Sequence, residues 1–128
     1  MIDHIGFAVG DIERSKAFYD AALAPLGIEA MMTVTPEQTG KGTAMGYGKG
    51  GNPFFWIGDR EQVGEGTHVA LTAQTRAEVD GFHRAALAAG GTDHGAPGLR
   101  PIYGPNYYAA FVLDPDGVNI EAVCHAPA

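Results

Sequence analysis

The amino-acid sequence predicts an α+β fold in which one βαβββ unit occurs twice in tandem. Three observations lead to this expectation: an internal repeat, an alternating apolar run at the start of each half, and a helical pattern after each run. With 128 residues, the chain has the length of one compact domain. We therefore expect a single domain over residues 1–128, with a first module at about residues 1–60 and a second at about residues 66–126.

The repeat appears when the sequence is shifted by 64 positions, which aligns residues 4–30 with residues 68–94 without a gap. Seven of the 27 aligned residues are identical, and His4 and His68 are one of the identical pairs. Each unit of a repeated sequence is one supersecondary motif. The two halves should therefore share their order of strands and helices.

The start of each half predicts a strand followed by a helix. The alternating runs IDHIGFAV and THVALTA are typical of strands with one buried face. Asp11 and Thr75 then occupy N-cap positions, where a side-chain oxygen accepts hydrogen bonds from free amides of the first turn. Proline follows the first predicted helix and glycine follows the second, and these residues end the helices. The sequence thus predicts helices over about residues 12–23 and 76–89.

Further strands complete each half. Strand candidates follow the two helices at residues 28–35, 43–48, 53–58, 107–113 and 118–124. The Asp-Pro-Asp-Gly sequence at residues 114–117 predicts the turn between the last two of them. The segment 93–106 is rich in glycine and proline and predicts a long loop, in which any strand would be short.

Charge and composition restrict the partners. Fifteen acidic and eight basic residues give a net charge of −7, which repels phosphate backbones and anionic membrane surfaces. No run approaches the roughly 18 to 20 apolar residues of a membrane-spanning helix. One cysteine and a start without signal-peptide character favour the reducing cytoplasm. We expect a cytoplasmic protein that binds a small molecule, with neither nucleic acid nor membrane as a partner.

Strand alternation places three potential metal ligands on one face. In the first strand of each half, large apolar side chains alternate with His4 and His68, so both histidines should point away from the helix. The same count along VNIEAVC places Glu121 on that face. Two imidazoles and one carboxylate are typical of open metal sites, because three protein ligands leave positions for water, oxygen or substrate. The sequence predicts one divalent ion at these residues, with iron, manganese and zinc as candidates.

Four further side chains are candidates for substrate contact. Trp56 lies in a strand that is apolar on both sides and should form a wall of the pocket. Alternation along residues 107–113 predicts that Tyr108 faces the metal ligands, where it would orient substrate or serve as a catalytic acid. Arg100 is suited to pair with a substrate carboxylate or phosphate. Tyr103 belongs to a cluster of tyrosines at the predicted loop over residues 93–106.

Three segments carry a resemblance to a known family: DHIGFAVGDIERSKAFYDAALAPLGI, THVALTA and YYAAFVLDPDGVNIEAV. The sequence resembles the vicinal oxygen chelate superfamily, which includes glyoxalase I, bleomycin-resistance proteins, fosfomycin-modifying transferases and extradiol dioxygenases. The resemblance covers nearly the whole chain and implies a cup-shaped mixed sheet with helices on its outer face. It also implies metal ligands from the first and last strand of each module, and His4, His68 and Glu121 match three of these four places.

The fourth place is a glutamate in glyoxalase I and falls near Phe55 or Trp56, where this sequence has no acidic residue. The resemblance therefore implies an open metal site in an enzyme acting on a small oxygen-chelating or electrophilic molecule. Lyase or isomerase, dioxygenase and thiol-transferase reactions all stay open. The alternative is a metal-free drug-binding protein of the bleomycin-resistance type. In either case the resemblance implies a homodimer, because family members commonly complete their cups or clefts through a dimer.

Overall fold

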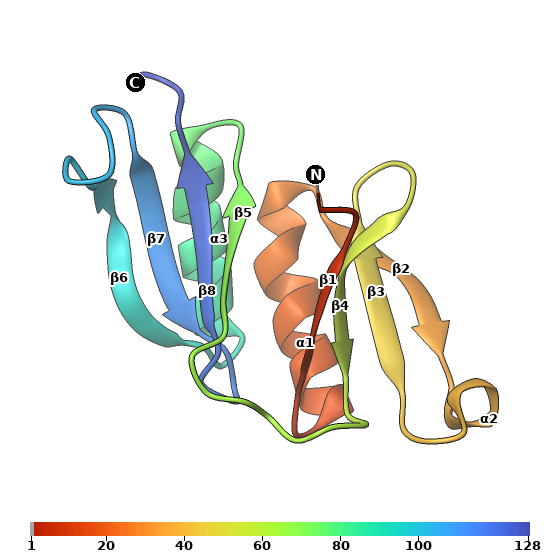
Figure 1. The fold of residues 1–128 in the computed structure, drawn as a ribbon. Coiled ribbons are helices and arrows are strands. Elements are labelled where there is room, and N and C mark those ends of the chain that lie inside the picture. The colour runs from red at the N-terminus through yellow and green to blue at the C-terminus, as the bar shows by residue number, and fades with distance from the viewer. Residues whose placement is uncertain (1) are drawn as a thin grey trace.

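The computed structural model describes residues 2–128, apart from the side chain of Thr39. Two four-stranded mixed sheets form the fold, and each carries a long helix on one face. Figure 1 shows the two modules beside each other, joined by an extended linker along one edge of the molecule. The prediction of an α+β fold made of two βαβββ modules is confirmed.

Both modules have the same topology. The first consists of β1 (Ile5–Ala8), α1 (Ile12–Leu23), the 3₁₀ turn η1 (Ala24–Leu26), β2 (Glu29–Val34), α2 (Pro36–Thr39), β3 (Ala44–Gly48) and β4 (Pro53–Gly58). The second consists of β5 (His68–Thr72), α3 (Arg76–Ala88), β6 (Thr92–Leu99), β7 (Tyr108–Leu113) and β8 (Asn119–Cys124). The strand orders are β1-β4-β3-β2 and β5-β8-β7-β6, with only the first and last strand of each module parallel. First and last strands are therefore neighbours in each sheet.

The predicted caps start both long helices. The side chain of Asp11 accepts a hydrogen bond from the backbone amide of Arg14 at 3.1 Å, and that of Thr75 accepts one from the amide of Glu78 at 3.1 Å. Each bond satisfies an amide that has no partner within its helix. Within residues 2–128, no helix combines the length and apolar character needed to cross a membrane.

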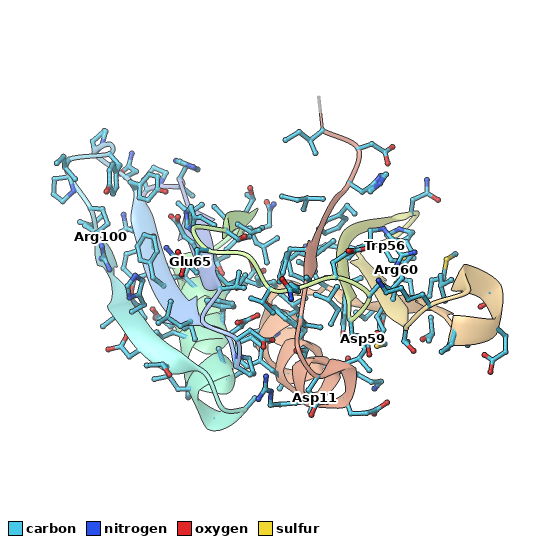
Figure 2. The ribbon with its side chains drawn as sticks, turned by 60° about the horizontal axis from the view of Figure 1, so that its bottom comes forward. Asp11, Trp56, Asp59, Arg60, Glu65 and Arg100 are labelled. Atoms are coloured by element: carbon cyan, nitrogen blue, oxygen red, sulfur yellow. The ribbon has the colours of Figure 1, made fainter. Side chains whose placement is uncertain are left out.

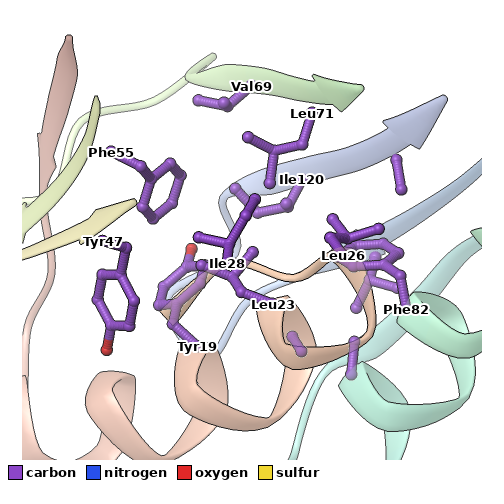
Figure 3. Close-up of a cluster of buried hydrophobic side chains, with 14 of the residues drawn as sticks. Tyr19, Leu23, Leu26, Ile28, Tyr47, Phe55, Val69, Leu71, Phe82 and Ile120 are labelled. Atoms are coloured by element: carbon purple, nitrogen blue, oxygen red, sulfur yellow. The ribbon is translucent and has the colours of Figure 1, made fainter. Parts of the chain in front are cut away.

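The core lies between the two helices and the inner faces of both sheets. Contacts between the modules run from α1 and η1 to α3, and Figure 3 shows Leu26 beside Phe82 at this contact. Within the first module, the rings of Tyr19 and Phe55 pack with centroids 5.2 Å apart. Burying these large side chains removes apolar surface from water, which is the main favourable contribution to folding. Each sheet thus has one face against the helices, and we call the opposite one its open face.

The prediction of a long loop over residues 93–106 is wrong in its first half, where β6 forms an eight-residue strand. Register shifts near Gly95 and Gly98 interrupt its pairing with β7. β6 is an edge strand, and edge strands tolerate bulges. They also tolerate proline, here Pro97, which has no amide hydrogen to donate to a neighbouring strand. A composition typical of loops is therefore compatible with a strand at this edge.

The turn between β7 and β8 also connects the two modules. The buried hydroxyl of Tyr19 on α1 donates a hydrogen bond of 2.7 Å to Oδ2 of Asp114, which is 3% exposed. Oδ1 of Asp114 accepts the amides of Asp116 and Val118, each at 2.8 Å. Asp116 in turn pairs with Arg14 of α1 at 2.9 Å. Burial, followed by the nearby Asp114 carboxylate, raises the pKa of Tyr19 well above its usual value and keeps it a donor.

Candidate functional site

The structure brings His68 and Glu121 together on the open face of the second sheet. His68 begins β5, where side chains alternate between exposed and buried, and Glu121 lies on the adjacent β8. Nε2 of His68 lies 3.0 Å from Oε1 of Glu121, and the carboxylate is almost fully buried. The predicted faces of both strands are confirmed, since Val69 and Ile120 point to the core.

The ring nitrogens of His68 have different environments. Nδ1 lies 3.1 Å from the backbone carbonyl oxygen of Asn119. A carbonyl oxygen only accepts, so Nδ1 carries the proton. In a neutral ring this leaves the lone pair of Nε2 directed at the Glu121 carboxylate. Two acceptors at this distance require a proton or a cation between them.

The His68 nitrogen and the Glu121 oxygen fit a divalent metal ion as ligands. An imidazole nitrogen and a carboxylate oxygen are ligands for iron, manganese and zinc. The carbonyl of Asn119 fixes the tautomer of His68, as outer partners of metal-binding histidines do. Among the described residues, Oδ1 of the Asn119 side chain is buried and has no hydrogen-bond partner. It lies on the same strand face as Glu121, which adds an unsatisfied acceptor to that surface.

Tyr107 holds the other oxygen of the carboxylate. Its hydroxyl donates a hydrogen bond to Oε2 of Glu121, so that Oε1 is the oxygen left beside His68. Burial and this hydrogen bond raise the pKa of Tyr107 to about 12. The exposed Tyr103 and His125 pack against the Tyr107 ring, with centroids 5.3 and 5.2 Å away. Tyr107 therefore fixes the carboxylate, a role that the sequence did not reveal.

The predicted orientation of Tyr108 is wrong. Its hydroxyl donates a 2.6 Å hydrogen bond to Asp80 on α3, and the guanidinium of Arg76 lies 5.1 Å from its ring centroid. The open face instead carries Phe111, whose ring stacks on His68 at 6.2 Å. The apolar residues on the helix side of β7 are small, which lets α3 pack closely, whereas the large Phe111 has room on the open face. The prediction failed because the larger side chains of this strand do not mark its buried face. The consecutive alanines in the sequence are the signal that a helix could pack closely here.

Arg100 lies on the same open face as the His68–Glu121 pair. Its guanidinium donates to the carbonyl oxygens of Gly98 and Ala96 at 2.8 and 2.7 Å, and it lies 5.5 Å from the ring centroid of Phe111. These contacts hold the cation near the stack formed with His68. The position is compatible with the predicted role of Arg100 toward an anionic substrate group.

A separate pocket of about 660 Å³ occupies the open face of the first sheet. His4 and Trp56 line it, together with Arg60 from the segment after β4, and His68 and Glu121 do not. Nδ1 of His4 lies 2.7 Å from the carboxylate of Asp3. Figure 2 shows Trp56 and Arg100 on different sheets, well apart from each other. We call this cavity the first-sheet pocket.

One chain assembles only part of the predicted metal site. Among residues 2–128, no group of three or more histidine, cysteine, aspartate or glutamate side chains is close enough to hold a metal ion. His68 and Glu121 are in contact, whereas His4 directly precedes β1 of the other sheet and lines the first-sheet pocket. Their joint role as three ligands of one ion stays a prediction.

Comparisons with known proteins agree with this fold. Residues 1–122 match the family model of the glyoxalase/bleomycin resistance protein/dioxygenase superfamily. A glyoxalase/bleomycin resistance protein from Albidiferax ferrireducens T118 is 31% identical, with a TM-score of 0.75 and 98% of each chain covered. Glyoxalase I from Zea mays is 22% identical, with a TM-score of 0.70 and coverage of 95% of this chain but 43% of the maize chain, and shows the fold alone. No curated protein matches the sequence.

Proposed function

Because this chain belongs to the glyoxalase/bleomycin resistance protein/dioxygenase superfamily, we propose that it is a metal-dependent enzyme acting on a small oxygen-chelating molecule. The observation that supports this proposal most is the His68–Glu121 pair, in which Nε2 and Oε1 lie 3.0 Å apart beneath an aromatic stack. An imidazole nitrogen beside a carboxylate oxygen, with the histidine tautomer fixed by a backbone carbonyl, is a suitable pair of ligands for a divalent ion.

We propose that the third ligand, His4, comes from a second copy of the chain. His4 and the His68–Glu121 pair belong to different modules, and the modules of one chain contact each other through the helices and the β7–β8 turn. In a two-fold symmetric dimer, the first module of one chain can lie opposite the second module of its partner. Two equivalent sites would then form, each with two histidines and one glutamate.

The side chains around this site have distinct tasks. A bound divalent ion would polarise a chelated oxygen and stabilise the negative charge that develops on it. Tyr107 holds Glu121 so that one carboxylate oxygen faces His68. Arg100, fixed over Phe111, would pair with a carboxylate or phosphate of the substrate. Open coordination positions are compatible with lyase or isomerase, dioxygenase and thiol-transferase reactions.

Metal analysis tests the proposal. Protein purified without added ions and then loaded with Fe²⁺, Mn²⁺ or Zn²⁺ should retain close to one ion per chain after desalting. Glu121→Gln, which removes the ligand charge at nearly constant size, should bind at least about 100-fold more weakly. If the wild type retains less than about a tenth of an equivalent of every ion, the metal site is wrong and a metal-free drug-binding protein becomes the better reading.

Tyr107→Phe tests how the carboxylate is held. Losing the hydroxyl frees Oε2 of Glu121, and the affinity for Co²⁺ measured by calorimetry should fall about 10-fold. The visible spectrum of the bound Co²⁺ should also change, because the carboxylate can then present both oxygens. Tyr103→Phe is the matched control, since Tyr103 is 64% exposed. Identical affinity and spectrum in the wild type and Tyr107→Phe would contradict a positioning role.

A further inference from the structure

Strand register identifies the residue that stands in place of the fourth metal ligand. In the second sheet Ala70 pairs with Glu121, and in the first sheet Gly6 pairs with Trp56. Gly6 and Ala70 are equivalent under the 64-residue repeat. Trp56 therefore occupies the position of Glu121, so one sheet presents an indole where the other presents a carboxylate.

Glycine on the neighbouring strand makes room for this indole. Trp56 pairs with Gly46 on β3, and a Cβ atom at Gly46 would lie 2.8 Å from both Cη2 and Cζ2 of the ring. Real Cβ atoms essentially never approach other atoms so closely. Gly46 does not have a positive φ, so space and not backbone conformation requires glycine here. The indole thus lies across the sheet over Gly46, instead of standing upright.

The first-sheet pocket lies against this indole. Its volume of about 660 Å³ is in the range of pockets that hold small organic molecules. The residues that surround Trp56 on the sheet are mainly small or apolar, and the charged side chains Arg60 and Glu61 come from the segment after β4. Trp56 is only partly buried, so a ligand in the pocket can reach the ring.

We propose that Trp56, lying over Gly46, is a binding platform for a planar aromatic ring of the substrate. An indole prefers a flat π-system to a puckered ring of equal size, because offset stacking adds to apolar burial. The proposal rests on the proposed function, because His4, the proposed third metal ligand, lines this pocket and would bring it beside the metal site in the dimer. Binding of the ring itself requires no bound metal.

The test uses 2-naphthol and its saturated counterpart decahydro-2-naphthol as probes, with purified protein freed of metal by EDTA. Trp56 is the only tryptophan, so its indole N–H gives a single cross-peak in a ¹H–¹⁵N spectrum. We expect 2-naphthol to shift this peak and, by equilibrium dialysis, to bind about 10-fold more tightly than the saturated alcohol. Equal binding of the two probes, or binding of neither, would overturn the proposal.

Matched variants separate the platform from other binding surfaces. Trp56→Leu keeps an apolar side chain and should abolish the roughly 10-fold preference, while Trp56→Phe should retain part of it. Gly46→Ala keeps the tryptophan but displaces its ring and should weaken 2-naphthol binding, whereas Gly51→Ala, whose Cβ would meet nothing within 4 Å, should not. A preference that survives in Trp56→Leu contradicts the platform. Retention of metal is measured separately, so a failure of the platform can be distinguished from a failure of the proposed metal site.

Discussion

Co-expression of His4→Ala and Glu121→Ala chains should restore metal binding that neither variant has by itself. If each site combines the first module of one chain with the second module of its partner, the heterodimer contains one site with both defects and one intact site. A heterodimer purified through two different affinity tags should therefore bind about half as much metal as the wild-type dimer. Metal per dimer, measured by mass spectrometry, is the readout.

The matched control pairs His68→Ala with Glu121→Ala. Both residues lie in the second module, 3.0 Å apart, so every site of that heterodimer keeps a defect. It should bind no more metal than the single variants. If neither heterodimer recovers metal binding, the site shared between two chains is wrong. If both recover it, binding does not depend on these three residues acting together.

Asp114→Ala should produce the largest loss of stability among single substitutions outside the apolar core. It removes the acceptor of the buried Tyr19 hydroxyl and of two backbone amides in the turn before β8. Leaving these donors unpaired should lower the free energy of unfolding by about 2–4 kcal/mol. Urea denaturation followed by circular dichroism measures the loss.

Smaller changes at the same contact show whether it couples the modules. Tyr19→Phe removes only the hydroxyl and should cost about 1–3 kcal/mol, because the buried Asp114 carboxylate loses a donor. Tyr103→Phe, at an exposed tyrosine, should leave stability unchanged within about 0.5 kcal/mol. Combined with Asp114→Asn, Tyr19→Phe should cost less than the sum of the two single changes. Strict additivity would show that the two side chains contribute independently.

Local patterns were enough for most of the fold. The repeat, the caps at Asp11 and Thr75 and the alternation in β5 and β8 predicted elements and faces that the structure confirms. These signals depend on neighbouring residues along the chain, which is why the sequence alone carries them. Two predictions failed because contacts between distant segments decided the outcome. In β6 the edge position tolerates glycine and proline, and in β7 close packing of α3 against small residues reversed the expected faces.

Residue pattern and type predicted the two βαβββ modules, the family and the shared face of His68 and Glu121, since period, caps and residue type are properties of nearby residues. The surroundings of these two side chains depend on the tertiary structure. It selected Tyr107 over Tyr108 for the open face, equated Trp56 with Glu121, and placed His4 at the first-sheet pocket. These outcomes depend on how the strands pair and on how closely the helices approach them. The spacing of residues along the chain encodes neither the pairing nor the approach.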